Sequence, residues 1–114
     1  MDRNNENTRY LVCVTQPCKK MFLLGLFDSY ELALGHEMDA IYSFREEHAD
    51  EIESYNISLP FVIEGHDDVE FIDVEVKEKG DETIYKYRYS ISQEKYLDKV
   101  KEAIRPSEPE AEAK

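Results

Sequence analysis

The sequence contains no tryptophan, only two cysteines, and four glycines and four prolines scattered over 114 residues. So few cysteines exclude a disulfide-rich scaffold, and scattered glycines exclude a glycine-rich phosphate loop. The longest apolar run, residues 21–27, is far shorter than the roughly 18 residues of a membrane-spanning helix. The polar N-terminus lacks the apolar segment of a signal peptide. We therefore expect a cytoplasmic protein that does not engage membranes.

Basic residues are scarce as well, because 14 lysines and arginines stand against 26 acids and give a net charge of −12. Residues 28–82 hold 18 of the acids and only three bases, whereas the two flanking segments are weakly basic. A charge of this sign repels nucleic acids and anionic membranes, and it attracts basic proteins. The charge pattern thus predicts a basic protein partner and no direct binding to nucleic acid.

The two cysteines, Cys13 and Cys18, are separated by four residues. A zinc site needs further ligands at suitable spacing, and no second Cys or His pair follows. The spacing favours one buried thiol on a strand and one thiol in a turn, with a hairpin disulfide as the alternative.

The first half of the chain has the pattern of a hairpin followed by a helix. Residues 9–15 and 21–27 are rich in β-branched and apolar residues, and a turn with Pro17 separates them. The second strand is apolar on both faces, which predicts a central position in the sheet. Asp28 is suited to cap a helix of about 20–24 residues. Its apolar stripe follows spacings of three and four through Leu34, Met38, Ile41, Arg45, His48 and Ile52.

The second half alternates in the manner of strands over residues 55–64, 69–78 and 83–91. Pro60 is expected at a sheet edge or a bulge, because proline donates no hydrogen bond to a ladder. Ser92 is predicted to cap a short C-terminal helix, and residues 106–114 to form a disordered acidic tail. The predicted fold is α+β: one domain over residues 1–105, with a mainly antiparallel sheet of about five strands in the order ββαβββα and the helices on one face.

The junction between the second strand and the first helix carries one resemblance. The run KMFLLGLFDSYELALGHEM resembles a module of many small bacteriophage and mobile-element proteins, in which a strand ends in Phe and a capping pair precedes a helix that opens with Glu and Ala. The matching residues are Phe27, Asp28, Ser29, Glu31 and Ala33. The resemblance covers about a fifth of the chain. It implies a phage-type accessory protein and assigns no functional residue.

Patterns for metal binding and catalysis are weak. The run His66-Asp67-Asp68 does not follow the alternating acids, glycine and final glutamate of a calcium-binding loop. His36 and Asp39 share a helix face, but two ligands do not complete a site. No Ser/His or Cys/His arrangement is evident, and no carboxylate pair stands out from the rest. We therefore expect no metal, no cofactor and no enzymatic activity.

The acids themselves have spacings that resemble the spacing of phosphates in DNA. Acids two apart on a strand lie about 6.6–6.8 Å apart, and acids three or four apart on a helix lie about 5–6 Å apart. This pattern predicts a non-enzymatic acidic protein that occupies a basic, nucleic-acid-binding surface of a host protein as a DNA mimic or inhibitor. The predicted partner-binding residues are Asp39, Glu46, Glu47, Asp50, Glu51, Glu53, Asp67, Asp68, Asp73 and Glu75.

Other interpretations of the same residues remain open. The acids can simply form a solvated surface. An assembly module is the main alternative function, with contacts made through a sheet edge or through the aligned face of Tyr85, Tyr87 and Tyr89. A small acid–base or metal enzyme is a third. The mimicry hypothesis depends on folding that brings the central acids together on one surface.

Overall fold

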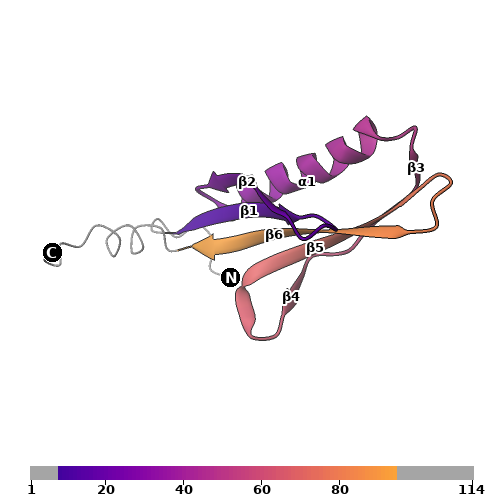
Figure 1. Cartoon of the computed structure of the whole chain (residues 1–114). Helices are drawn as coiled ribbons and strands as arrows, with labels where there is room; N and C mark the ends of the chain where they lie inside the picture. Colours follow the sequence, from indigo (N-terminus) through magenta and orange to yellow (C-terminus); the bar gives the residue numbers. More distant parts are fainter. Residues whose placement is uncertain (1–7, 95–114) are drawn as a thin grey trace, which may run out of the picture.

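The computed structural model describes residues 8–94, which form one antiparallel sheet and one helix. The predicted α+β class is therefore confirmed. The sheet order is β2-β1-β6-β5-β3, and β4 pairs with the first part of β5. Figure 1 shows the helix along one face of the sheet, and β4 projecting on the other side. The elements are β1 (Arg9–Thr15), β2 (Met21–Phe27), α1 (Tyr30–Glu47), β3 (Ile52–Ile57), β4 (Phe61–Ile63), β5 (His66–Glu78) and β6 (Ile84–Glu94).

The core lies between α1 and the sheet. Alternate residues of β5 and β6 point toward the helix, because side chains of a strand alternate between its two faces. Ile41 of α1 packs with Ile72 and Val74 of β5, and all three are almost completely buried. The Tyr55 hydroxyl of β3 donates a 2.8 Å hydrogen bond to the Ile41 carbonyl, which fixes the helix over the sheet.

The helix begins one residue later than the sequence predicted. Ser29 is the N-cap, and its hydroxyl accepts a hydrogen bond from the Leu32 N–H, whereas Asp28 bonds to Arg9 at 2.9 Å. The helix ends at Glu47 after 18 residues, so the predicted length was too great. Ile52, assigned to the helical stripe from its spacing, is the first residue of β3.

The predicted central position of the second strand is wrong. β2 is at the edge of the sheet and has only β1 as a hydrogen-bonded neighbour among the described residues. The central strands are β1, β6 and β5. The exposed side chains of β2 remain apolar at this edge: Met21, Phe22, Leu23 and Leu26.

The strand predicted over residues 55–64 is interrupted at residues 58–60 and forms two strands, so that the described sheet has six. At this break, Ser58 donates its N–H to the Asp73 carbonyl, and its hydroxyl accepts from the Asp73 N–H. Pro60 lies between the strands, outside both ladders, as its missing N–H requires. Leu59, within this break, is 86 % exposed.

The last described strand also differs from the prediction. β6 continues through Ser92 to Glu94, so Ser92 does not cap a helix. The remainder of the predicted C-terminal helix and the predicted tail lie outside the described residues. Within residues 8–94, α1 lacks the combination of length and apolarity needed to cross a membrane.

Candidate functional site

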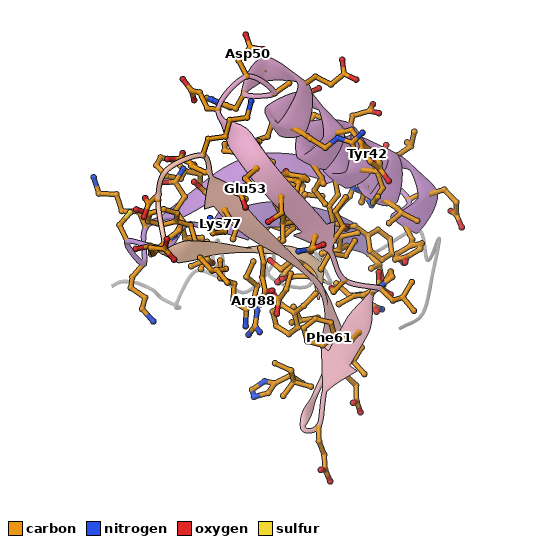
Figure 2. All side chains as sticks on the ribbon, turned by 90° about the vertical axis from the view of Figure 1, so that its right-hand side faces the viewer. Tyr42, Asp50, Glu53, Phe61, Lys77 and Arg88 are labelled. Carbon is orange, nitrogen blue, oxygen red and sulfur yellow. The ribbon has the colours of Figure 1, made fainter. Side chains whose placement is uncertain are left out.

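The outer face of α1 carries a group of acids. Ala33, Glu37 and Ile41 face the sheet, so residues half a turn away face solvent. Asp39 and Glu46 are exposed on this outer face, and the exposed Glu47 lies on the flank. The three acids, together with Tyr42 and Ser43, line a shallow depression. Figure 2 shows Tyr42 on the outer side of the helix.

The turn after α1 continues this acidic surface. The His48 N–H closes the helix by donating to the carbonyls of Phe44 and Glu46. Asp50 and Glu51 follow at the exposed turn, and Figure 2 places Asp50 at the end of the helix. The Glu51 carbonyl accepts a 2.9 Å hydrogen bond from the N–H of Lys79, which ties the turn to the β5–β6 hairpin. We refer to Asp39, Glu46, Glu47, Asp50 and Glu51 as the helix acids.

Most helix acids are not neutralised by neighbours. Among residues 8–94, no basic side chain lies within ion-pair distance of Asp39, Glu46, Glu47 or Asp50. Glu51 approaches the His48 ring at 3.3 Å, and Arg45 lies over the ring of Tyr42. The helix acids therefore present a strongly negative field to solvent.

Asp73 has a different environment, on the face of the sheet opposite α1. Its carboxylate accepts two hydrogen bonds from Arg88, at 2.7 and 2.9 Å, and lies 3.5 Å from the Lys86 ammonium. The Arg88 hydrogen bonds hold the pKa of Asp73 below its usual value. Glu75 shares this face and pairs across the ladder with Lys86. Both acids thus alternate with bases instead of extending the acidic surface.

Arg88 also holds β4 against the sheet. Its guanidinium lies 5.6 Å from the centre of the Phe61 ring and 5.1 Å from that of Phe71. Phe61 and Phe71 are paired across the β4–β5 ladder. Figure 2 shows Arg88 and Phe61 below the sheet, on the side away from α1. Cation–π contacts and the double hydrogen bond to Asp73 make Arg88 a structural residue here.

The remaining predicted acids lie elsewhere. Glu53 of β3 pairs with Lys77 at 3.0 Å. Asp67 and Asp68 are exposed at the start of β5, beside the β4–β5 turn that projects away from the helix (Figure 1). The structure thus separates the ten predicted acids into three groups: the helix acids, Asp67 and Asp68 at the β4–β5 hairpin, and the three acids of the sheet, Glu53, Asp73 and Glu75. It does not bring them onto one surface.

The aligned tyrosines of β6 belong mainly to the core. Tyr89 is buried, and the half-buried Tyr87 packs against Phe44 of α1 with ring centres 5.3 Å apart. Tyr85 lies at the open end of the row, where its hydroxyl donates to Asp81. The tyrosine face is therefore largely covered by the helix.

Sequence reasoning missed the most unusual acid, Glu37. It is completely buried between α1 and the sheet, and neither carboxylate oxygen has a hydrogen-bond partner. Burial, with a smaller contribution from Glu70, raises its pKa to about 8. The sequence signal for its burial was its position four residues from both Ala33 and Ile41, on the face of α1 that points toward the sheet.

The cysteines and the metal patterns can also be assessed. Cys13 is buried on β1 and Cys18 is exposed in the β1–β2 turn, and both are free, which confirms the favoured interpretation. Within residues 8–94, no three His, Cys, Asp or Glu side chains converge in a way that could hold a metal ion.

Comparison with known proteins adds no relative: no family model, no curated protein and no solved structure matches this chain.

Proposed function

We propose that the protein is a non-enzymatic acidic binding protein that places the helix acids on a basic surface of another protein. The surface proposed is one that otherwise binds DNA or RNA, so that occupancy by this protein inhibits nucleic-acid binding. The resemblance of residues 20–38 to phage-type modules suggests a phage-encoded protein that acts in the host cytoplasm. Compared with the sequence-based hypothesis, the binding residues are restricted to Asp39, Glu46, Glu47, Asp50 and Glu51.

The carrying observation is that four of the helix acids are exposed without an ion-pair partner among the described residues. Two of them, Glu46 and Glu47, also lie in the last turn of α1. That end of a helix carries partial negative charge, so acids there are locally unfavourable by about 0.3–1 kcal/mol each. Acids placed against the local energetics favour a role in binding over a role in stability.

The mechanism is electrostatic. Acids at helical spacing lie about 5–6 Å apart, close to successive phosphates on one strand of DNA. When these carboxylates replace the counterions of a basic groove, release of the counterions contributes favourable free energy, as it does when the groove binds DNA. Long-range attraction also accelerates the encounter, and added salt weakens it. The proposed complex therefore forms quickly and loses affinity as ionic strength rises.

The test is capture of host proteins on the immobilised full chain at rising salt, followed by a DNA-binding assay of each captured protein. We expect basic nucleic-acid-binding proteins that elute with salt and lose their DNA in the presence of the wild-type protein. A triple variant, Glu46→Lys, Glu47→Lys and Asp50→Lys, should lose this inhibition at least tenfold.

The matched control reverses the same number of charges at the hairpin, with Glu64→Lys, Asp67→Lys and Asp68→Lys. This variant has the same net charge as the first but leaves the helix acids in place, so it should inhibit like the wild type. An equal loss of inhibition in both triple variants would show that net charge alone causes the effect. Capture that does not depend on ionic strength would contradict the proposal.

The assembly module remains the second candidate, and the exposed sheet edge is the observation that favours it. The tyrosine face offers little to a partner because α1 covers most of it. The apolar edge strand β2 offers more.

A further inference from the structure

We propose that a pocket beside the helix acids receives one arginine side chain of the basic partner. This inference rests on the proposed function and deepens it, because it names the side chain that the partner inserts and the place that receives it. The pocket lies between the C-terminal half of α1 and strands β1, β2 and β6, and its volume is about 230 Å³. Pockets for drug-sized ligands are larger, at about 300–1,000 Å³, so this one suits a single side chain.

The mouth of the pocket is part of the acidic surface. Ser43 and Glu47 are four residues apart on α1 and both are exposed, so their side chains lie side by side. Both residues line the pocket, and both also line the depression that contains Asp39 and Glu46. The pocket and the helix acids thus form one continuous surface, and a cation attracted by the acids reaches the mouth of the pocket.

The walls of the pocket are aliphatic and aromatic. Leu24 and Ala40 contribute aliphatic groups, and the half-buried rings of Phe44 and Tyr87 lie with their centres 5.3 Å apart. Long basic side chains bury their methylene groups against apolar surface, and a cation within about 6 Å of an aromatic ring centre is attracted to the face of the ring. Apolar walls, aromatic rings and the carboxylate of Glu47 together match a side chain with an apolar stem and a cationic head.

Unpartnered polar groups in the pocket favour a ligand that donates hydrogen bonds. Tyr89 lines the pocket and is only 5 % exposed, yet its hydroxyl makes no hydrogen bond to any described residue, and the same holds for the Tyr87 hydroxyl. The Glu47 carboxylate likewise has no ion-pair partner within residues 8–94. Buried polar groups without partners are unfavourable, and a bound donor removes this cost.

These features favour arginine over lysine. A guanidinium group carries several N–H donors in a planar fork and stacks on aromatic rings, whereas an ammonium group is a compact charge that is more strongly hydrated. None of the described residues that line the pocket is basic. Arg45 lies over the ring of Tyr42, and Arg88 is bonded to Asp73 on the opposite face of the sheet. The arginine that fits the pocket is therefore supplied by the partner.

The first experiment is an NMR titration of the full chain with a blocked glycine–arginine–glycine peptide, up to about 10 mM. Matched peptides carry lysine in place of arginine, or citrulline, which has the shape of arginine without its charge. We expect the arginine peptide to shift the ring resonances of Phe44 and Tyr87, and to bind at least tenfold more tightly than the citrulline peptide. Equal binding of the arginine and lysine peptides, or shifts confined to residues outside the pocket, would overturn the proposal.

Two variants of the chain locate the site. Glu47→Gln removes the carboxylate at the mouth, and Ala40→Leu fills the pocket without a change of charge, so each should weaken binding of the arginine peptide at least fivefold. Glu31→Gln, which removes the same charge from the exposed first turn of α1, is the control and should bind like the wild type. Circular dichroism verifies that each variant is folded. Wild-type affinity in folded Glu47→Gln or Ala40→Leu protein would contradict the assignment.

The capture assay separates this inference from the proposed function. Ala40→Leu keeps every helix acid, so its capture of basic host proteins should remain salt-sensitive but weaken at least fivefold. Unchanged capture by Ala40→Leu would leave the proposed function intact and overturn the assignment of the pocket. Binding of the arginine peptide without capture of any nucleic-acid-binding protein would support the pocket and contradict the proposed function.

Discussion

Glu37 of α1 is buried against the sheet, where the charge of Glu70 of β5 acts on it. Glu70 is hydrogen-bonded to Tyr30 and not to Glu37. The Tyr30 hydroxyl donates a 2.5 Å hydrogen bond to Glu70, while both oxygens of Glu37 lack partners. A buried carboxylate without partners is costly when ionised, and its pKa of about 8 reflects this cost. At neutral pH Glu37 is therefore mainly protonated.

The pKa of Glu37 predicts that stability falls as the pH rises. The folded state retains a proton up to about pH 8, whereas the unfolded chain releases it near pH 4.5. The contribution is thus fully present below pH 4.5 and is lost as the pH approaches and passes 8, by roughly 3–5 kcal/mol. Urea unfolding of Glu37→Gln should show a much flatter dependence over this range. Glu75→Gln, an exposed acid on the other face, is the control and should keep the wild-type slope; an unchanged slope in Glu37→Gln would disprove the assignment.

The stability of the fold is predicted to depend on the guanidinium group of Arg88 and not only on its positive charge. Arg88→Lys keeps one positive charge but loses the double hydrogen bond to Asp73 and the planar contact with Phe61 and Phe71. We expect a loss of about 1–3 kcal/mol in the free energy of unfolding, with faster hydrogen exchange in β4. Arg45→Lys, on the exposed side of α1, should change stability by less than about 0.5 kcal/mol and serves as the comparison.

Glu46 is predicted to trade stability against binding. Glu46→Lys replaces an acid by a base in the last turn of α1, where the helix dipole favours positive charge. Thermal unfolding should show a gain of about 0.3–1 kcal/mol in the free energy of unfolding, even though the same change weakens binding of the proposed partner. Asp39→Lys, in the middle of the helix, should lack most of this gain. A destabilised Glu46→Lys protein would contradict the placement of the helix terminus.

Gly35 offers a test of local packing. A Cβ atom at this exposed helical position meets no other atom within 4 Å, so Gly35→Ala should stabilise the protein by about 0.5–1 kcal/mol through the helix propensity of alanine. Gly25→Ala is the contrasting variant, because its Cβ would lie 2.6 Å from ring atoms of Phe27 and must displace that ring from His36. Chemical denaturation that gives the same sign for both variants would refute this distinction.

Local patterns predicted most of the elements but not their order in space. The first two strands, the alternation of β5 and β6, and the start of α1 to within one residue follow from side-chain periodicity and capping. The position of β2 does not, because apolarity on both faces is typical of a central strand, whereas the strand pairings place β2 at the edge of the sheet. The division of residues 55–64 was missed because the Ser58–Asp73 hydrogen bonds join segments distant in sequence.

The sequence predicted the candidate site only in part, because the neighbours of an acid across the sheet depend on strand pairing. Helical spacing grouped Asp39 and Glu46 correctly, since both lie outward on one element. The spacing of Asp73 and Glu75 was equally regular, but their neighbours on β6 are bases, and only the β5–β6 register reveals this. Counting charges along the chain therefore overestimated the connected acidic surface.

The pairing of β1 with β6 has a consequence for synthesis of the protein. Arg9 is opposite Glu94, so within residues 8–94 the strand that leaves the ribosome first borders the strand that leaves last. A nascent chain that ends before β6 has an open β1 edge and an incompletely covered helix, and it can complete its sheet only after β6 has left the exit tunnel. Contacts between such distant segments slow folding and favour dependence on chaperones. Early translation arrest should thus yield an aggregation-prone fragment instead of a smaller folded unit.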